Sequence, residues 1–265
     1  MPRIAIAVEY DGAAFEGWQS QPHGRTVQDA VQAAAAQITM HPVVLHCAGR
    51  TDTGVHATTQ IAHFDTAAHR PLSAWVRGVN AHLPSSVSVR WALEVDDQFH
   101  ARFSAQARRY RYLLLNRTVR PAILAGKVGW CHAPLSLAAM QAACACLPGE
   151  HDFSAFRAAQ CQAKSPVRSM SLAQVVQKGE LFAFDFEANG FLHHMVRNLV
   201  GALVHIGRGE APPEWMAQLL QMRDRRLAAP TFSPAGLYLC GIRYPDQWQL
   251  PDQGQIFAPP SLFSL

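Results

Sequence analysis

The first part of the chain alternates between strand-like and helix-like patterns of apolar positions. Apolar residues recur at every second position from Ile4 to Val8, which predicts a strand over residues 3–10. Thr26 stands before the helix-period run VQDAVQAAAAQI, and Asp29 three residues later completes a partial capping box, so a helix is expected to begin there. The further elements predicted in this part are strands over 43–47 and 60–64, a helix over 73–83 and a strand over 87–95.

The resulting order of strand, helix, strand, strand, helix, strand is that of a ferredoxin-like unit. The second part of the chain repeats this order more loosely. Its predicted strands cover 109–115, 128–131, 167–176, 181–187 and 237–244, and its predicted helices cover 136–147 and 191–206. We therefore expect an α+β fold in which two ferredoxin-like halves share a mainly antiparallel sheet.

The boundary between the halves is expected near residues 98–105. We assign residues 1–103 to an N-terminal α+β half and residues 104–245 to a C-terminal α+β half. Residues 246–265 are rich in Pro, Gln and Ser, and we expect this tail to wrap the surface or to fray.

Composition is that of an ordinary soluble globular protein. The 265 residues are 49% hydrophobic and 16% charged, which is enough for a sizeable core. The apolar run at the N-terminus is too short for a secretory signal and soon meets Glu9 and Asp11, and no stretch approaches the roughly 20 apolar residues that span a bilayer, so we expect a cytoplasmic protein. The six cysteines lack CxxC spacing, which disfavours a zinc site or a disulfide framework.

Positive charge is concentrated in one segment, although the net charge is only +4. Residues 102–120 contain no acidic residue, and aromatic residues lie among their arginines. Arginine forks bind phosphate and aromatic rings stack on unpaired bases, so the segment suits a folded RNA. The alternative is a solvated strand face. The residues concerned are Arg102, Arg108, Arg109, Arg111, Arg117 and Arg120, with Phe103, Tyr110 and Tyr112.

The stretch GRTDTGVHA, residues 49–57, places several reactive side chains in one short loop between two predicted strands. Asp52 stands two residues before Gly54, where a tight turn would present the carboxylate. Arg50, two residues before Asp52, would favour the ionised carboxylate by lowering its pKa, which suits a nucleophile or a base. The alternative is an Asx turn in which Asp52 caps its own backbone.

The tripeptide Asp-Thr-Gly also occurs in aspartic peptidases. Those enzymes need two carboxylates that share a proton, from two such turns or from a dimer of short chains. This chain has one such tripeptide, and Arg50 would oppose the shared proton, so the sequence disfavours a peptidase.

Ten motifs, in order along nearly the whole chain, make the sequence similar to the tRNA pseudouridine synthase A family. They are YDGAAFEGWQSQP, the TVQ that opens the first predicted helix, GRTDTGVHA, QIAHFD, NAHLP, FHARFSA, RRYRY, GEHDFSAF, FLHHMVRNLVG and GLYL. The resemblance implies a pseudouridine synthase fold with the catalytic cleft between the two halves. It further implies an isomerase that needs no cofactor and no metal.

In that family the aspartate of GRTD is catalytic, and it corresponds to Asp52. The reaction breaks the bond between C1′ and N1 of uridine, turns the bound base, and joins C5 to C1′. A carboxylate could attack C1′, attack C6 or remove the C2′ proton, and the sequence leaves these three open.

The resemblance also assigns three substrate-binding residues. Arg50 corresponds to an arginine beside the base and backbone, Arg197 to one that pairs with the catalytic aspartate, and Tyr110 to a tyrosine that stacks on the target base. Tyr110 would lie on the apolar face of its strand, where a flipped base could be received, and its hydroxyl could relay the C5 proton. The alternatives are a core tyrosine for Tyr110 and a helix residue reaching solvent for Arg197. Tyr112 is expected in the core.

The remaining polar residues of these motifs receive no catalytic assignment. His193 and His194 are expected on one helix about 100° apart, which excludes chelation in the usual i, i+4 manner. Phe232 and Ser233 depart from the family pattern. Residues expected to shape the loop or to touch RNA are Asp11, Gln19, Gln21 and His56.

By resemblance, the substrate is tRNA at uridines 38, 39 and 40 of the anticodon stem loop, and the protein is a homodimer. A dimer would also give a single 29.1 kDa chain a longer basic cleft for an L-shaped tRNA. The alternative function is a non-catalytic module of the same fold that binds or folds tRNA.

Overall fold

The structure, a computed structural model, describes residues 1–251 and divides into two compact units. Among these residues, the first unit comprises 1–107 and 238–251, and the second comprises 108–237. The last strand therefore groups with the first unit, whereas the sequence analysis placed it in the half 104–245. The proposed division into functional domains stays a prediction, and residues 252–265 of the expected tail lie outside the described residues.

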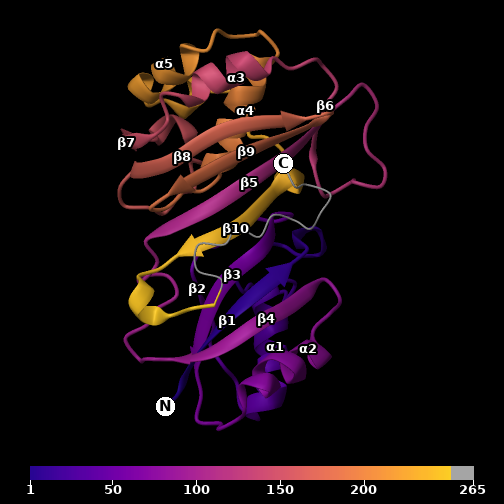
Figure 1. Cartoon of the computed structure of the whole chain (residues 1–265), viewed down its shortest axis with the longest axis vertical. Helices are drawn as coiled ribbons and strands as arrows, with labels where there is room; N and C mark the ends of the chain where they lie inside the picture. Colours follow the sequence, from indigo (N-terminus) through magenta and orange to yellow (C-terminus); the bar gives the residue numbers. More distant parts are fainter. Residues whose placement is uncertain (252–265) are drawn as a thin grey trace. The chain divides into compact units, whose positions relative to one another are not determined.

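The first unit is built on a sheet with the strand order β4-β1-β3-β10 (Figure 1). β1 is antiparallel to both β3 and β4. The other edge of β3 is divided: β2 pairs with its later part in an antiparallel sense, and β10 pairs with its first two residues in parallel. The strands of this sheet are β1 (Arg3–Tyr10), β2 (His46–Cys47), β3 (His56–Asp65), β4 (Val87–Val95) and β10 (Leu237–Arg243).

Two helical segments belong to the first unit. In α1 (Val27–Thr39), the Thr26 side chain accepts a hydrogen bond from the Asp29 N–H, so the predicted helix start is confirmed. The helix predicted over 73–83 is a π-helical stretch (Ala74–Gly78) that continues into α2 (Val79–His82), and α1 and α2 lie side by side (Figure 1).

Both faces of this sheet are covered. Ile4, Ile6 and Val8 of β1 are buried on one face, as the alternating pattern predicted. On the opposite face, Ala5, Ala7 and Ile61 pack with Phe99, Tyr244 and Leu250, so the segments that follow β4 and β10 close the core.

The second unit is built on the strand order β5-β9-β8-β7, in which all neighbours are antiparallel, while the short β6 pairs with β5 in parallel. The predicted α+β class with a mainly antiparallel sheet is confirmed; the catalytic cleft stays a prediction. The elements are β5 (Ala107–Asn116), β6 (Gly129–Cys131), α3 (Leu137–Cys144), β7 (Gly149–Asp152), β8 (Val167–Lys178), β9 (Leu181–Ala188), α4 (Met195–Gly207) and α5 (Trp215–Met222).

The core of the second unit is formed by β9 and α4. Phe182, Phe184 and Phe186 alternate along β9 and are fully buried. Nearly every residue of α4 is buried, and a Cβ at Gly201 would lie 2.3 Å from the Pro230 carbonyl oxygen, so this helix requires glycine at its closest approach.

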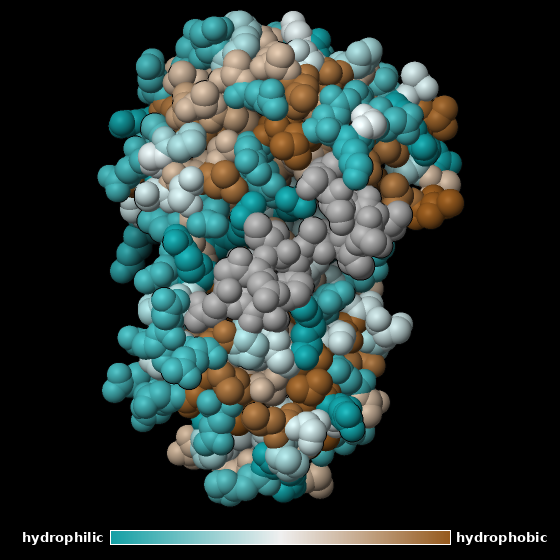
Figure 2. Space-filling view, viewed as in Figure 1, coloured by the Kyte–Doolittle hydropathy of each residue, from teal (hydrophilic) through white to brown (hydrophobic). Residues whose placement is uncertain are grey.

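The face drawn in Figure 2 mixes hydrophilic and apolar residues, with brown residues interspersed among teal ones. Within residues 1–251, no helix combines the length and the apolar character needed to cross a membrane. All six cysteines are free thiols, as expected, and Cys131, Cys144 and Cys240 are buried.

Candidate active site

The loop over residues 48–55 joins β2 to β3 and carries Arg50 and Asp52. The side-chain amide of Gln60 binds its start: Oε1 accepts a hydrogen bond from the Gly49 N–H (3.3 Å), and Nε2 donates one to the Gly49 carbonyl. The loop therefore leaves the sheet with its first backbone groups already paired, although β2 has ended.

The tip of this loop is a tight turn. The Val55 N–H donates to the Asp52 carbonyl at 3.1 Å, and Gly54 has a φ of +78°, which glycine adopts without a steric penalty. Asp52 is half-buried and Arg50 is exposed. The turn fixes the backbone of Asp52, as the sequence predicted.

A second segment, residues 10–18, packs directly on the loop. The Tyr10 hydroxyl lies 2.7 Å from the Thr51 hydroxyl, and the backbone N–H of Trp18 donates to the Thr51 carbonyl at 3.0 Å. A Cβ at Gly12 would lie 1.9 Å from the Val55 carbonyl oxygen, so this position has no room for any side chain. The motifs YDGAAFEGWQSQP and GRTDTGVHA are thus two halves of one packed structure.

His56 connects these segments to β3. Its side chain is 2% exposed, its Nδ1 accepts from the Gly12 N–H at 3.1 Å, and the same nitrogen lies 3.1 Å from Asp11 Oδ1. Its ring stacks on Tyr238 of β10 with 4.7 Å between centroids. Burial raises the pKa of the Tyr238 hydroxyl, and the nearby negative charge of Asp11 adds to this increase. These contacts support the loop-shaping alternative for His56.

Tyr110 lies on β5 in the second unit. It is 8% exposed, and its ring meets Phe191 edge-on with 5.0 Å between centroids, a contact that fixes the plane of the phenol ring. Tyr112 is fully buried and donates from its hydroxyl to the Ser233 carbonyl at 2.9 Å, so its expected place in the core is confirmed.

Arg197 lies in the first turn of α4. Its Nε donates to the Phe232 carbonyl at 2.9 Å, and the Phe232 N–H donates to the Arg197 carbonyl at 3.2 Å. This reciprocal pair holds the stem of a half-buried side chain, which disfavours an arginine that simply reaches solvent. Both hydrogen bonds use backbone groups of Phe232, so they do not depend on its side chain.

The prediction that His193 and His194 share a helix is wrong. α4 begins one residue after His194, which has a left-handed φ of +61°, and the two rings lie 4.0 Å apart. The backbone N–H of His193 donates to Cys161 Sγ at 3.4 Å. Burial acts to raise the pKa of the Cys161 thiol, but backbone N–H groups, that of His193 included, and the Arg157 charge outweigh burial and lower it.

The arginines of residues 102–120 differ in exposure, so the segment is not a uniformly exposed basic surface, and its binding to RNA stays a prediction. Arg111 is 9% exposed, and its guanidinium makes two 2.8 Å hydrogen bonds to Asp185, its fully buried neighbour on β9. Arg109 lies 3.8 Å from the same carboxylate. The buried Asp185 carboxylate thus engages Arg111 closely and Arg109 at a longer distance, whereas Arg102 in the first unit is exposed.

The four predicted site residues fall into two pairs. Arg50 and Asp52 lie on one loop of the first unit, while Tyr110 and Arg197 lie on β5 and α4 of the second. Their assembly into one site, and the role of each, stay predictions.

Sequence reasoning missed the contributions of Thr51 and Gln60. Gln60 is fully buried, and it is a polar residue at the start of the apolar run QIAHF, which is the signal that could have identified it. Thr51 is 7% exposed, and nothing in the local pattern indicates that its hydroxyl would meet Tyr10.

Comparison with known proteins gives matches over nearly the whole chain. The family described as tRNA pseudouridine synthase matches residues 6–104 and 143–245. A tRNA pseudouridine synthase A from Dechloromonas aromatica (strain RCB) is 63% identical over 255 residues, which cover 96% of this chain and 97% of that protein. One from Aromatoleum aromaticum is 61% identical over 260 residues, covering 98% of each chain.

Solved structures match far more distantly. The crystal structure of the archaeal box H/ACA sRNP Nop10-Cbf5 complex aligns with 76% of this chain and 44% of that chain, at 12% identity and a TM-score of 0.36.

Proposed function

The chain belongs to the tRNA pseudouridine synthase family, an isomerase family, and we propose that it converts uridine to pseudouridine at positions 38, 39 and 40 of the tRNA anticodon stem loop. The reaction breaks the C1′–N1 bond and forms a C1′–C5 bond in the same nucleotide. N1 gains a proton and C5 loses one, so the reaction is an isomerisation that balances without an oxidant or a reductant.

Asp52 is the catalytic carboxylate in this proposal. Its support is the geometry of the loop over residues 48–55, which is held by Gln60 on one side and by residues 10–18 on the other. Three first steps fit a carboxylate here: attack on C1′, attack on C6, or removal of the C2′ proton. All three need the ionised form and a fixed position, which the clamped turn supplies.

The substrate-binding roles follow the same proposal. Tyr110 stacks on the flipped base, for which its fixed ring plane is suited. Arg50 is exposed on the Asp52 loop and contacts the RNA backbone, and Arg197 pairs with the Asp52 carboxylate. The protein acts as a cytoplasmic homodimer.

The test is release of tritium from C5 of uridine in an unmodified tRNA transcript. Wild-type protein is compared with Asp52→Ala and with Asp52→Asn, which keeps the shape but not the charge, and tRNA binding is measured in parallel. We expect release by the wild type, and a loss of at least about a thousandfold in both variants with binding retained.

The matched control is Glu94→Gln, which removes an exposed carboxylate from β4 of the same unit. It should release tritium at the wild-type rate. If wild-type protein binds tRNA but releases no tritium, the alternative of a non-catalytic tRNA-binding module is correct instead.

A further inference from the structure

Four side chains of the first unit form a surface group that we call the aromatic–basic patch: His46, His100, Arg102 and Phe103. His100 is half-buried, and the other three are exposed. The His100 and Phe103 rings lie 4.4 Å apart, and the His46 and His100 rings 5.4 Å apart. The Arg102 guanidinium carbon lies 5.6 Å from the centre of the Phe103 ring. The patch thus joins a flat aromatic face to a permanent cation.

Phe103 differs from the other exposed apolar side chains of the described residues. It is 75% exposed, whereas Trp130, the other aromatic residue of that group, is 38% exposed and donates its indole N–H to the Arg117 carbonyl. The rest are aliphatic or methionine side chains, for example Ile123. A large aromatic ring left in water beside an arginine is typical of a surface that receives another flat group.

The patch is carried by a turn that is built around His100. The His100 Nδ1 accepts hydrogen bonds from the Arg102 N–H (3.1 Å) and the Phe103 N–H (3.4 Å). The backbone N–H of His100 donates to Ser104 Oγ at 3.0 Å, and the backbone N–H of Ser104 donates to the His100 carbonyl at 2.9 Å. These bonds order the turn before any ligand arrives, which lowers the entropic cost of binding.

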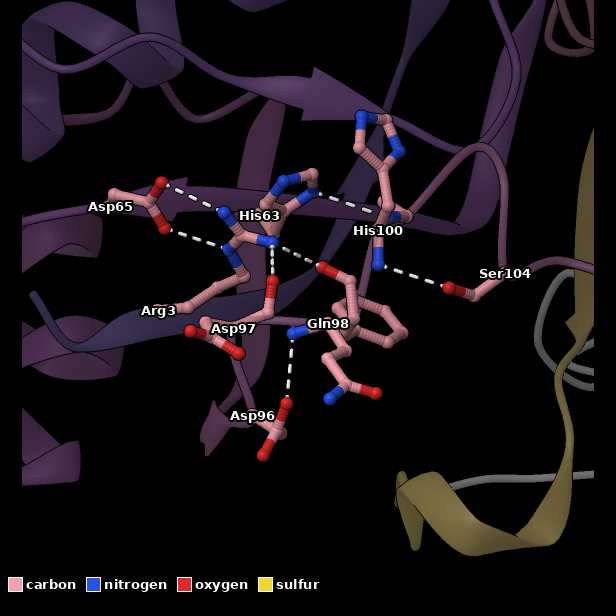
Figure 3. Close-up of polar contacts among 10 residues, drawn as sticks. Arg3, His63, Asp65, Asp96, Asp97, Gln98, His100 and Ser104 are labelled. Atoms are coloured by element: carbon pink, nitrogen blue, oxygen red, sulfur yellow. Dashed lines mark hydrogen bonds and ion pairs between the residues drawn. The ribbon is translucent and has the colours of Figure 1, made fainter.

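The turn is also anchored to the sheet, as Figure 3 shows. The Arg3 guanidinium holds Asp65 on β3 through a hydrogen bond of 2.7 Å and donates to the backbone carbonyls of Asp97 and Phe99. His63 Nδ1 accepts from the Ala101 N–H at 3.2 Å. The backbone on both sides of His100 is therefore fixed to the core.

The positive charge of the patch comes from Arg102, because the Arg3 guanidinium nearby is paired with Asp65. Burial lowers the pKa of His100, and the neighbouring basic residues His46, Arg3 and Arg102 act in the same direction. Nδ1 of His100 already accepts two N–H groups. At neutral pH the ring is therefore uncharged and can stack, while Arg102 supplies the positive charge.

We propose that the aromatic–basic patch is an accessory RNA contact, in which the Phe103 ring stacks on an unpaired base and Arg102 binds an adjacent phosphate. It lies outside the Asp52 loop. The proposal rests on the proposed function, because it takes tRNA as the ligand. Arg102 and Phe103 begin the segment 102–120 that the sequence analysis assigned to RNA, and both are exposed.

The experiment measures the Kd of unmodified tRNA transcript at several salt concentrations for wild-type protein and for variants of the patch. Phe103→Ala should weaken binding about tenfold at every salt concentration, because stacking on one base is lost while the charge stays. Phe103→Trp should bind within about twofold of the wild type, because a ring is kept. Arg102→Gln should reduce the slope of log Kd against log salt by about one, because one phosphate contact is lost.

Two variants serve as controls. Ile123→Ala removes a side chain that is 96% exposed, and it should leave the Kd unchanged. Arg70→Gln removes an exposed charge of the same unit and should leave the salt slope unchanged.

Three outcomes would overturn the proposal. Phe103→Ala could match Ile123→Ala, or Phe103→Trp could bind as weakly as Phe103→Ala. Alternatively, Phe103→Ala could change the sedimenting mass without changing the Kd, which would make the patch a contact between copies of this chain. A failure of the proposed function is distinguishable, because it appears as absent tritium release in the wild type whatever the patch variants bind.

Discussion

His63 is a buried histidine whose ring makes aromatic contacts and accepts a backbone hydrogen bond. It lies on β3 with 2% of its surface exposed, packs beside the rings of His46 and His100, and accepts the Ala101 N–H. Burial, reinforced by the neighbouring basic groups, lowers its pKa from 6.5 to about 3. Protonation of this ring would add a charge to the core and remove the acceptor for Ala101.

Stability should therefore decrease in mild acid. Between about pH 6.5 and pH 3 the unfolded chain binds a proton at this histidine that the folded chain does not. The free energy of unfolding falls as pH falls through this window, by up to about 1.4 kcal/mol per pH unit from this residue. Urea unfolding at about pH 6.5 and pH 5 measures the decrease.

His63→Gln should remove this part of the decrease, because its amide oxygen can accept the Ala101 N–H and does not titrate. His69→Gln, at an exposed position, should keep the wild-type slope. An unchanged slope in His63→Gln would show that other groups cause the acid sensitivity.

The surroundings of individual functional residues could be predicted from the sequence only in part. Asp52 was identified on a turn because glycine and arginine spacing are local signals. The state of Arg111 was not, because its partner Asp185 lies on another strand and only the pairing of β5 with β9 brings them together. A run of like charges along the chain gives no information about the residue across the sheet.

At the scale of elements, residues 10–18 and the loop over 48–55 form one rigid pair. Gly12 meets Val55 with no space for a Cβ, and Gly17, with a φ of +86°, would place a Cβ 2.9 Å from the Thr51 carbonyl oxygen. Backbone against backbone leaves no flexible side chain to absorb a change, so any added atom moves the loop itself.

Gly12→Ala should consequently displace the Asp52 turn. We expect a loss of about a hundredfold in kcat for tritium release with the fold retained, because a shift near 1 Å misplaces a catalytic group. Circular dichroism checks the fold and saturating tRNA isolates kcat.

The control for Gly12→Ala is Gly24→Ala. Gly24 has a φ of +69° but no neighbour within 4 Å of an added Cβ. This variant should lose about 1 kcal/mol of stability from backbone strain and keep its kcat. A wild-type kcat in Gly12→Ala would show that this contact does not position the loop.

Element boundaries were predictable where the ends carry chemical signals. The start of α1 was found from Thr26 and Asp29. The start of α4 was missed because the apolar pattern of FLHHM continues through a left-handed His194. β7, with the sequence GEHD, has no apolar periodicity, and its strand form follows from pairing with β8.

At the scale of the whole molecule, the chain leaves its first unit after Ala107 and returns to it at Tyr238. Tyr238 and Leu239 then pair in parallel with His56 and Ala57. The strand itself was predicted, but its partner was not, since a pairing across so many residues has no local signature. The sheet of the first unit is therefore complete only after β10, the last strand of the described chain, has been synthesised.

The proposed homodimer belongs to this scale. Sedimentation equilibrium should give twice the 29.1 kDa of one chain at concentrations that support turnover. An isolated anticodon stem loop should then bind more weakly than full-length tRNA, because two subunits divide the body and the target loop between them. A monomer with full activity, or equal affinity for both RNAs, would contradict this arrangement.

The contact between Gly12 and Val55 limits which segments of related proteins can be recombined. The two segments lie far apart in the sequence, but this backbone-to-backbone contact makes them one structural part. A chimera that takes the Asp52 loop from one parent and residues 10–18 from another keeps this contact only if the second parent also has glycine at position 12. Recombination within this molecule is tolerated best when both segments come from the same parent.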